Sequence, residues 1–148
     1  MSFLNDASPK CIQCVILRST KSLTADSLAG LAVLVLEDEL LIAMDVEQIC
    51  RDHGAGNIII KRSVSELGDH IWSETFDVAI IDLMLAGQTT LPFAKLLQER
   101  KTPFVFASGY TDVETLAADF PGAGLISKPY SESVLIDAIL NAVRTSGR

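Results

Sequence analysis

Polar side chains with reactive chemistry stand at the ends of several short apolar runs in this sequence. They are Glu37 and Asp38 after residues 32–36, Asp82 after 78–81, Ser108 after 104–107 and Lys128 after 125–127. Each is ordinary by itself, because such residues commonly cap helices or form turns. Their recurrence after four separate runs favours one shared site with three carboxylates, a hydroxyl and an ammonium group.

Three clustered carboxylates indicate a metal site. Two unit charges about 4 Å apart repel by roughly 4 kcal/mol at an effective dielectric constant of 20, and a divalent cation offsets that repulsion. Because Mg²⁺ prefers oxygen ligands, we expect Mg²⁺ (or Mn²⁺) to bind Asp38 and Asp82 directly, and Glu37 directly or through water. No cluster of His and Cys accompanies these acids, which argues against zinc.

A site of this kind suits phosphoryl transfer. The Asp82 carboxylate can act as a nucleophile and form an aspartyl phosphate. The metal, the Lys128 ammonium group and the Ser108 hydroxyl would stabilise charge on the phosphoryl oxygens. The residue types therefore allow a carboxylate such as Asp82 to accept a phosphoryl group, with Lys128 supplying a charge and Ser108 a hydrogen bond to its oxygens.

The apolar runs are the elements that must position these groups. Each is short and continuous, as in strands that are covered on both faces. Segments with helical periodicity lie between them, with start signals at Ser63 or Ser65, at Thr111 with Glu114, and at Ser131. This βαβαβαβαβα order predicts an α/β fold: a flavodoxin-like, doubly wound sheet of five parallel strands in the order 2-1-3-4-5. The ligand crevice of such a sheet lies outside the carboxyl ends of its strands.

Length and charge restrict the classes of function. The chain has 148 residues, a net charge of -7 and 49% apolar residues, which is typical of one globular domain. The acidic balance argues against direct DNA binding, and no apolar run is long enough for membrane insertion. Three cysteines make no disulfide framework, so we expect a cytoplasmic protein. Residues 1–30 are interpreted as a partly disordered N-terminal extension and 31–148 as the domain.

Four segments resemble the receiver domain of two-component response regulators: 33–39 (VLVLEDE), 77–82 (DVAIID), 106–109 (FASG) and 127–129 (SKP). The resemblance covers nearly all of 31–148. It implies a cis Lys128–Pro129 bond and the following roles: Asp82 as phosphoacceptor, Glu37 and Asp38 as the acidic pair for Mg²⁺, the Met84 backbone carbonyl as a further metal ligand, Ser108 as the switch hydroxyl, and Lys128 as a contact to the phosphoryl group.

Several positions depart from the family pattern. Leu125 stands three residues before the lysine, where the family usually carries an aromatic switch residue. Segment 106–110 (FASGY) instead resembles the FAT GUY subset, which often works with HWE-type or related histidine kinases. We hypothesise that Tyr110 partly replaces the missing aromatic residue. Ala86 and Thr90 also stand where the family commonly has proline and glycine.

The resemblance implies a single-domain phosphorylation switch that is not an enzyme beyond its own phosphorylation and dephosphorylation. A sensor histidine kinase or a histidine phosphotransfer protein would supply the phosphoryl group. Because no effector domain is expected, a partner protein would carry the output. The responding surface of the family maps to about residues 111–145, which would also be the surface of any homodimer.

The first helix offers a docking surface for the phosphodonor. Its apolar residues cover a wider arc than one core face needs, which leaves Leu41 and Met44 beside the acidic crevice. We predict that a four-helix histidine phosphodonor domain docks there. The alternative is that the N-terminal extension covers this helix.

Three other functions are weighed against the switch. Two belong to signalling: a phosphate shuttle or sink, and a pseudo-receiver that binds its partner without phosphorylation. The third is an aspartyl-phosphate phosphatase of the haloacid dehalogenase type. That chemistry needs a second acid two residues after the nucleophile, where Met84 stands.

Overall fold

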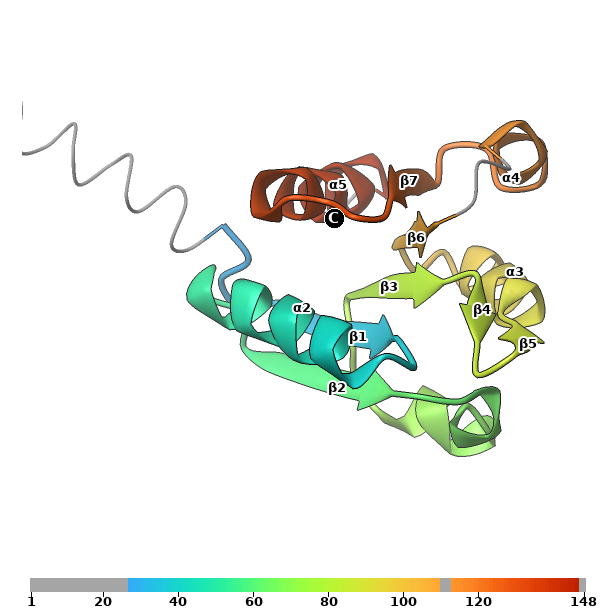
Figure 1. The fold of residues 1–148 in the computed structure, drawn as a ribbon, viewed down its shortest axis with the longest axis horizontal. Helices are drawn as coiled ribbons and strands as arrows, with labels where there is room; N and C mark the ends of the chain where they lie inside the picture. The colour runs from blue at the N-terminus through green and yellow to red at the C-terminus, as the bar shows by residue number, and fades with distance from the viewer. Residues whose placement is uncertain (1–26, 110–112, 147–148) are drawn as a thin grey trace, which may run out of the picture.

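Five parallel strands form the central sheet of the protein. The structure is a computed structural model that describes residues 27–109 and 113–146. The strands are β1 (Ala32–Leu36), β2 (Asn57–Lys61), β3 (Val78–Asp82), β6 (Phe104–Ser108) and β7 (Gly124–Ser127), in the order β2-β1-β3-β6-β7 (Figure 1). This is the predicted order 2-1-3-4-5, and all four pairings are parallel. The flavodoxin-like doubly wound fold is confirmed.

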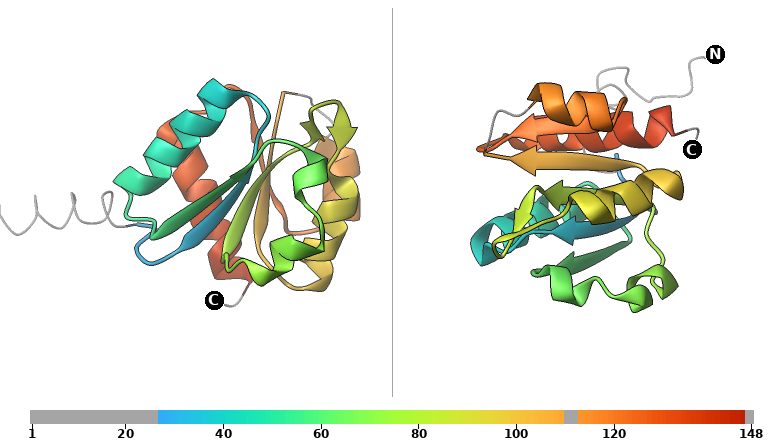
Figure 2. Two further views of the ribbon diagram at one scale, coloured as in Figure 1. Left: turned by 90° about the horizontal axis from the view of Figure 1, so that it is seen from below. Right: turned by 90° about the vertical axis from the view of Figure 1, so that its right-hand side faces the viewer.

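Helices cover both faces of the sheet (Figure 2). On one face α2 (Leu40–Asp52) and α5 (Glu132–Thr145) pack over Val33 and Val35 of β1. On the other, α3 (Leu91–Glu99) and α4 (Val113–Asp119) pack over Leu34 and Leu36. Successive side chains of a strand point to opposite faces, so the continuous apolar runs of the sequence supply two cores at once.

The segment between β2 and β3 is not the expected α-helix. It contains two 3₁₀ helices, Val64–Glu66 and Asp69–Ser73, separated at Gly68. Pieces this short favour the tighter 3₁₀ turn, and the glycine interrupts the helical run that the serines had indicated. Trp72 still covers the core, because its ring stacks on Phe93 with centroids 5.3 Å apart.

A small hairpin that the sequence did not predict follows β3. Strands β4 (Met84–Leu85) and β5 (Gln88–Thr89) pair antiparallel around a turn of two residues. Ala86 and Gly87 have φ angles of 51° and 82°, which fits the type I′ turn of short hairpins. The side chain of Leu85 is fully buried and fixes the hairpin to the core below α3.

The described part begins close to the predicted domain boundary at residue 30. Leu28 is fully buried, and its backbone N–H donates to the His53 carbonyl at 2.8 Å. The core therefore already includes a residue assigned to the extension. The extension itself falls almost wholly on residues 1–26, outside the described part, so that assignment stays a prediction. In the described residues, no helix has the length and apolarity needed to cross a membrane.

Candidate functional site

The predicted reactive side chains gather at one edge of the main sheet, where its strands end. Glu37 and Asp38 follow β1, Asp82 is the last residue of β3, Ser108 is the last residue of β6, and Lys128 follows β7. The register keeps these ends level, with the pairs Leu36–Ile81, Asp82–Ala107 and Ser108–Ser127. The topology therefore brings together residues that are up to 91 positions apart in the chain.

Glu37, Asp38 and Asp82 form one acidic cluster. Each offers a carboxylate oxygen, and the three oxygens lie within 4.8 Å of one another. Glu37 is only 3% exposed, while the other two are partly buried. Partial burial strengthens the repulsion between the carboxylates, so this arrangement calls for a nearby cation.

Lys128 is the cation that the protein itself provides. Its Nζ donates to Oε1 of Glu37 at 2.7 Å and to Oδ2 of Asp82 at 2.9 Å. The Lys128 backbone N–H donates to the Ser108 carbonyl at 2.8 Å, which ties the start of this side chain to β6. The bond between Lys128 and Pro129 is cis, as the resemblance implied.

Burial and ion pairing shift the pKa values of these groups. Burial raises the pKa of Glu37, and hydrogen bonds from Lys128 and from the Glu39 N–H offset only part of that rise. Burial alone would lower the pKa of Lys128, but its bonds to Glu37 and Asp82 outweigh burial and raise that pKa. The lysine therefore stays protonated at neutral pH and keeps a positive charge beside Asp82.

Asp38 is fixed by contacts that sequence reasoning missed. Its Oδ2 accepts a hydrogen bond at 3.0 Å from the Ala86 N–H at the tip of the β4–β5 hairpin. Its backbone carbonyl accepts one at 3.0 Å from Nη2 of Arg62. Arg62 follows β2 directly, and this position after a strand could have indicated that it lies at the site edge of the sheet. The Ala86 contact depends on a hairpin that the sequence did not predict.

Thr90 is a further buried polar group beside the phosphoacceptor. It is 1% exposed, and its Oγ1 lies 2.7 Å from the Asp82 carbonyl and 3.1 Å from the Leu83 carbonyl. The sequence marked this threonine only as a departure from the family pattern. Ser108 is equally buried at the end of the strand next to β3.

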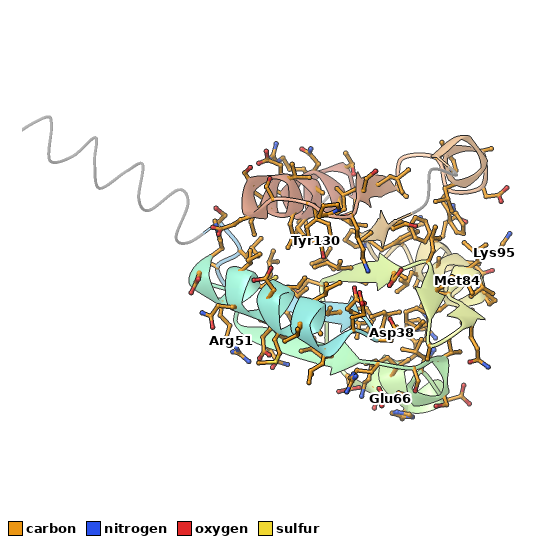
Figure 3. The ribbon with its side chains drawn as sticks, viewed as in Figure 1. Asp38, Arg51, Glu66, Met84, Lys95 and Tyr130 are labelled. Carbon is orange, nitrogen blue, oxygen red and sulfur yellow. The ribbon has the colours of Figure 1, made fainter. Side chains whose placement is uncertain are left out.

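The remaining predicted residues fall in three places. Met84 lies on β4 at the same edge of the sheet as Asp38 (Figure 3). Leu125 lies on β7, partly buried against the core on the α3 and α4 side. Tyr110 is outside the described residues, so its role as a switch residue stays a prediction.

Leu41 and Met44 are exposed beside the acidic cluster. Their exposed fractions are 80% and 53%, and Leu40 is 52% exposed. We call these three residues the apolar rim. They occupy the first turns of α2, which begins directly after Glu39, so the rim adjoins the site. A cavity of about 390 Å³ exists elsewhere, lined by Phe104, Phe120 and other residues that include none of the acids.

The donor set of the acidic cluster fits Mg²⁺. It consists of hard carboxylate oxygens, with a hydrogen-bonded loop beside them and with neither His nor Cys in the group. Such oxygens suit Mg²⁺, which keeps several waters and needs only one or two protein carboxylates.

Comparison with known families decides the class of the protein. A family profile described as the response regulator receiver domain matches residues 33–140. The chain belongs to this family. The match includes the whole main sheet except the first residue of β1, and every residue of the acidic cluster. A comparison with curated protein sequences found no match.

Solved structures of similar proteins share the fold. A receiver protein from Sinorhizobium medicae WSM419 is 20% identical, covering 79% of this chain and 97% of that one, with a TM-score of 0.70. SdrG from Sphingomonas melonis Fr1 is 27% identical, covering 77% and 97%, with a TM-score of 0.66. The response regulator PhyR from Brucella abortus is 24% identical with a TM-score of 0.70; the match covers 91% of this receiver but only 56% of PhyR.

Proposed function

We propose that this receiver accepts a phosphoryl group on Asp82 with Mg²⁺ and thereby changes its binding to a partner protein. The observation that carries the proposal is the arrangement around Asp82. Two further acids lie close enough to share a divalent cation with it, and a lysine ammonium group lies 2.9 Å from its carboxylate. The membership of the receiver family supports the same reading.

The chemistry starts with a carboxylate oxygen of Asp82 attacking the phosphorus of a phosphohistidine or of a small acyl phosphate. A new O–P bond forms as the P–N or P–O bond of the donor breaks, and the imidazole or the carboxylate leaves. When bound, Mg²⁺ supplies charge stabilisation for the transferring phosphoryl oxygens. The Asp38 and Asp82 carboxylates, Glu37 directly or through water, and the Met84 carbonyl are the groups that would hold it.

Lys128 and Ser108 act on the phosphoryl oxygens in this proposal. The Lys128 ammonium group already contacts Asp82, so it can follow the new negative charge at little reorganisation cost. Ser108 ends the strand next to β3, and in this proposal its hydroxyl donates to a phosphoryl oxygen on Asp82. Contacts that form only with the phosphorylated protein can shift it between two conformations.

Phosphorylation adds about -1.5 to -2 charges to the acidic edge of the sheet. We propose that the response reaches partners through α4, β7 and α5, which is also the surface proposed for a homodimer. The apolar rim on α2 would receive the histidine-bearing kinase or phosphotransfer domain. Its exposure supports this role, because a donor must bring its histidine to the adjoining cluster.

We also propose that the receiver catalyses no reaction beyond its own phosphorylation and dephosphorylation. The phosphatase alternative lacks its second acid, since the side chain two residues after Asp82 is the exposed thioether of Met84. A cytoplasmic location would give the site access to kinases and to Mg²⁺.

Intact-mass measurement after incubation with acetyl phosphate tests the proposal. We expect one phosphoryl adduct on the wild-type protein with Mg²⁺, and none with EDTA or on the Asp82→Asn variant. Asp119→Asn on α4 is the matched control and should phosphorylate like wild type. Failure to form the adduct with acetyl phosphate and with a kinase would favour a pseudo-receiver. Steady release of phosphate from organic phosphate esters would favour the phosphatase.

A further inference from the structure

We propose that Thr90 is a positioning residue of the metal and phosphorylation site, an inference that rests on the function proposed above. Its hydroxyl fixes the backbone at the end of β3, and through the β4–β5 hairpin it positions the Ala86 N–H against Asp38 together with the segment that carries the Met84 carbonyl.

The contacts of Thr90 occupy two successive carbonyls. Its Oγ1 donates to the Asp82 carbonyl at 2.7 Å, with the Leu83 carbonyl at 3.1 Å as a second acceptor. Its backbone N–H donates to the Leu83 carbonyl at 3.0 Å. These carbonyls lie at the end of β3, beyond its last pair with β1. Buried backbone acceptors need a donor, and Thr90 supplies one from its side chain and one from its backbone.

The hairpin connects this anchor to the second acid of the cluster. Thr90 follows the base of the hairpin and holds it, and the fully buried Leu85 anchors the strand that leads to the turn. Its tip donates from the Ala86 N–H to Oδ2 of Asp38 at 3.0 Å. The segment from Asp82 to Ala86 is therefore fixed at both ends, and the Met84 carbonyl lies between them.

Thr90 contacts no metal ligand side chain and acts only through the backbone. Hydrogen bonds that orient metal ligands commonly change metal affinity by about 10- to 100-fold when they are removed. The Thr90 hydroxyl holds one backbone segment and not the whole ligand set, so we expect the lower end, about tenfold weaker Mg²⁺ binding in Thr90→Val.

Three variants distinguish the effect of the Thr90 hydroxyl on Mg²⁺ binding from the effect of side-chain packing. Thr90→Val replaces the hydroxyl by a methyl group at nearly constant volume. Thr90→Ser keeps the hydroxyl and should bind Mg²⁺ like wild type. Thr89→Val is the matched control, because its hydroxyl lies in the same hairpin but accepts from the Leu91 N–H at the start of α3.

Two measurements on the unphosphorylated protein give the readout. Isothermal titration calorimetry with MgCl₂ gives the dissociation constant, and hydrogen–deuterium exchange in EDTA reports on the backbone of residues 83–90. We expect weaker Mg²⁺ binding and faster exchange in this segment for Thr90→Val only. Phosphorylation by acetyl phosphate should need more Mg²⁺ in this variant but reach the wild-type rate at saturation.

Three results would overturn the inference: wild-type Mg²⁺ affinity in Thr90→Val, equal weakening in Thr89→Val, or weakened binding in Thr90→Ser. The serine variant keeps the test valid if the valine variant does not fold. Absence of Mg²⁺ binding and of phosphorylation in the wild-type protein would instead refute the proposed function. The two failures are thus distinguishable.

Discussion

Replacing Lys128 by methionine should destabilise the metal-free protein and make its stability depend on Mg²⁺. The change keeps most of the aliphatic volume but removes the cation that contacts Glu37 and Asp82. The three carboxylates then face one another without compensation. A divalent cation bound to the acids would restore the balance, so the variant should gain more stability from Mg²⁺ than the wild-type protein does.

The magnitude follows from the two contact distances. At 2.7 Å and 2.9 Å, unit charges attract by about 6 kcal/mol each at an effective dielectric constant of 20. Desolvation of the ammonium group and of the acids cancels most of this attraction, and removing one partner of a buried pair typically costs about 3–5 kcal/mol. Lys128 is partly accessible, so we expect the free energy of unfolding to fall by about 3 kcal/mol in EDTA.

Urea unfolding followed by the fluorescence of Trp72, the single tryptophan, measures this effect. Lys95→Met on the exposed surface of α3 is the control and should unfold like wild type in both buffers (Figure 3). The reasoning is wrong if Lys128→Met matches wild type in EDTA, or if its deficit is the same with Mg²⁺ present. Either result would mean that the lysine does not neutralise the acidic cluster.

The same variant has a predictable response to pH. Burial raises the pKa of Glu37, and the Lys128 bond is one of the contacts that limit the rise, so the pKa should rise further without the lysine. The folded state then binds a proton at a higher pH than the unfolded chain. Stability is therefore lost as pH rises through the folded-state pKa, and the deficit against wild type should shrink at mildly acidic pH.

Four further outcomes are expected. Leu41→Asp should slow phosphotransfer from a histidine donor at least tenfold and leave phosphorylation by acetyl phosphate unchanged, because a charge in the apolar rim opposes docking by more than about 1.4 kcal/mol. The control Leu96→Asp, at an exposed position of α3, should change neither rate. If Leu41→Asp slows phosphorylation by both donors, a docking role is excluded. Ser131→Ala should lower the free energy of unfolding by about 1 kcal/mol, because Ser131 Oγ accepts from the Val134 N–H and caps α5. An unchanged urea midpoint would show that the cap contributes nothing to stability. Burial raises the pKa of Tyr130 to about 12, so in a Tyr110→Phe background the midpoint of its ultraviolet titration should lie at a clearly higher pH than that of free tyrosine. The free energy of unfolding should fall as pH rises beyond about 10, because the phenol ionises first in the unfolded chain. Burial also raises the pKa of Cys50 to about 12, so peptide mapping should find this thiol unmodified by iodoacetamide in the folded protein and modified in urea.

Much of the fold was predictable because two independent signals agreed. Continuous apolar runs such as 78–81 are typical of short strands covered on both faces, and the intervening helical periodicity favoured parallel crossovers. Strand order then fixed which ends are neighbours. The placing of Asp82 between the Glu37–Asp38 pair and Ser108 therefore followed from topology, without knowledge of any side-chain contact.

The contacts that support the site could not be predicted in the same way. The β4–β5 hairpin has strands of two residues, too short for a periodic signal, and Ala86 at its turn is not the residue that a positive φ angle favours. Without the hairpin, Thr90 had no visible relation to Asp82. Likewise, the serines at 63 and 65 indicated a helix start, but nothing local showed that Gly68 would divide the segment into 3₁₀ turns.

Among the described residues, the two apolar clusters lie on opposite faces of the sheet. Along β1, Val33 and Val35 belong to one cluster and Leu34 and Leu36 to the other. The acids extend from the strand ends and belong to neither helical layer. Mutations can therefore remodel the packing under α3 and α4 without altering what lies under α2 and α5. Evolution, or an engineer who rewires signalling, can therefore change the α4 part of the output surface independently of the apolar rim on α2, whereas α5 shares its core with α2.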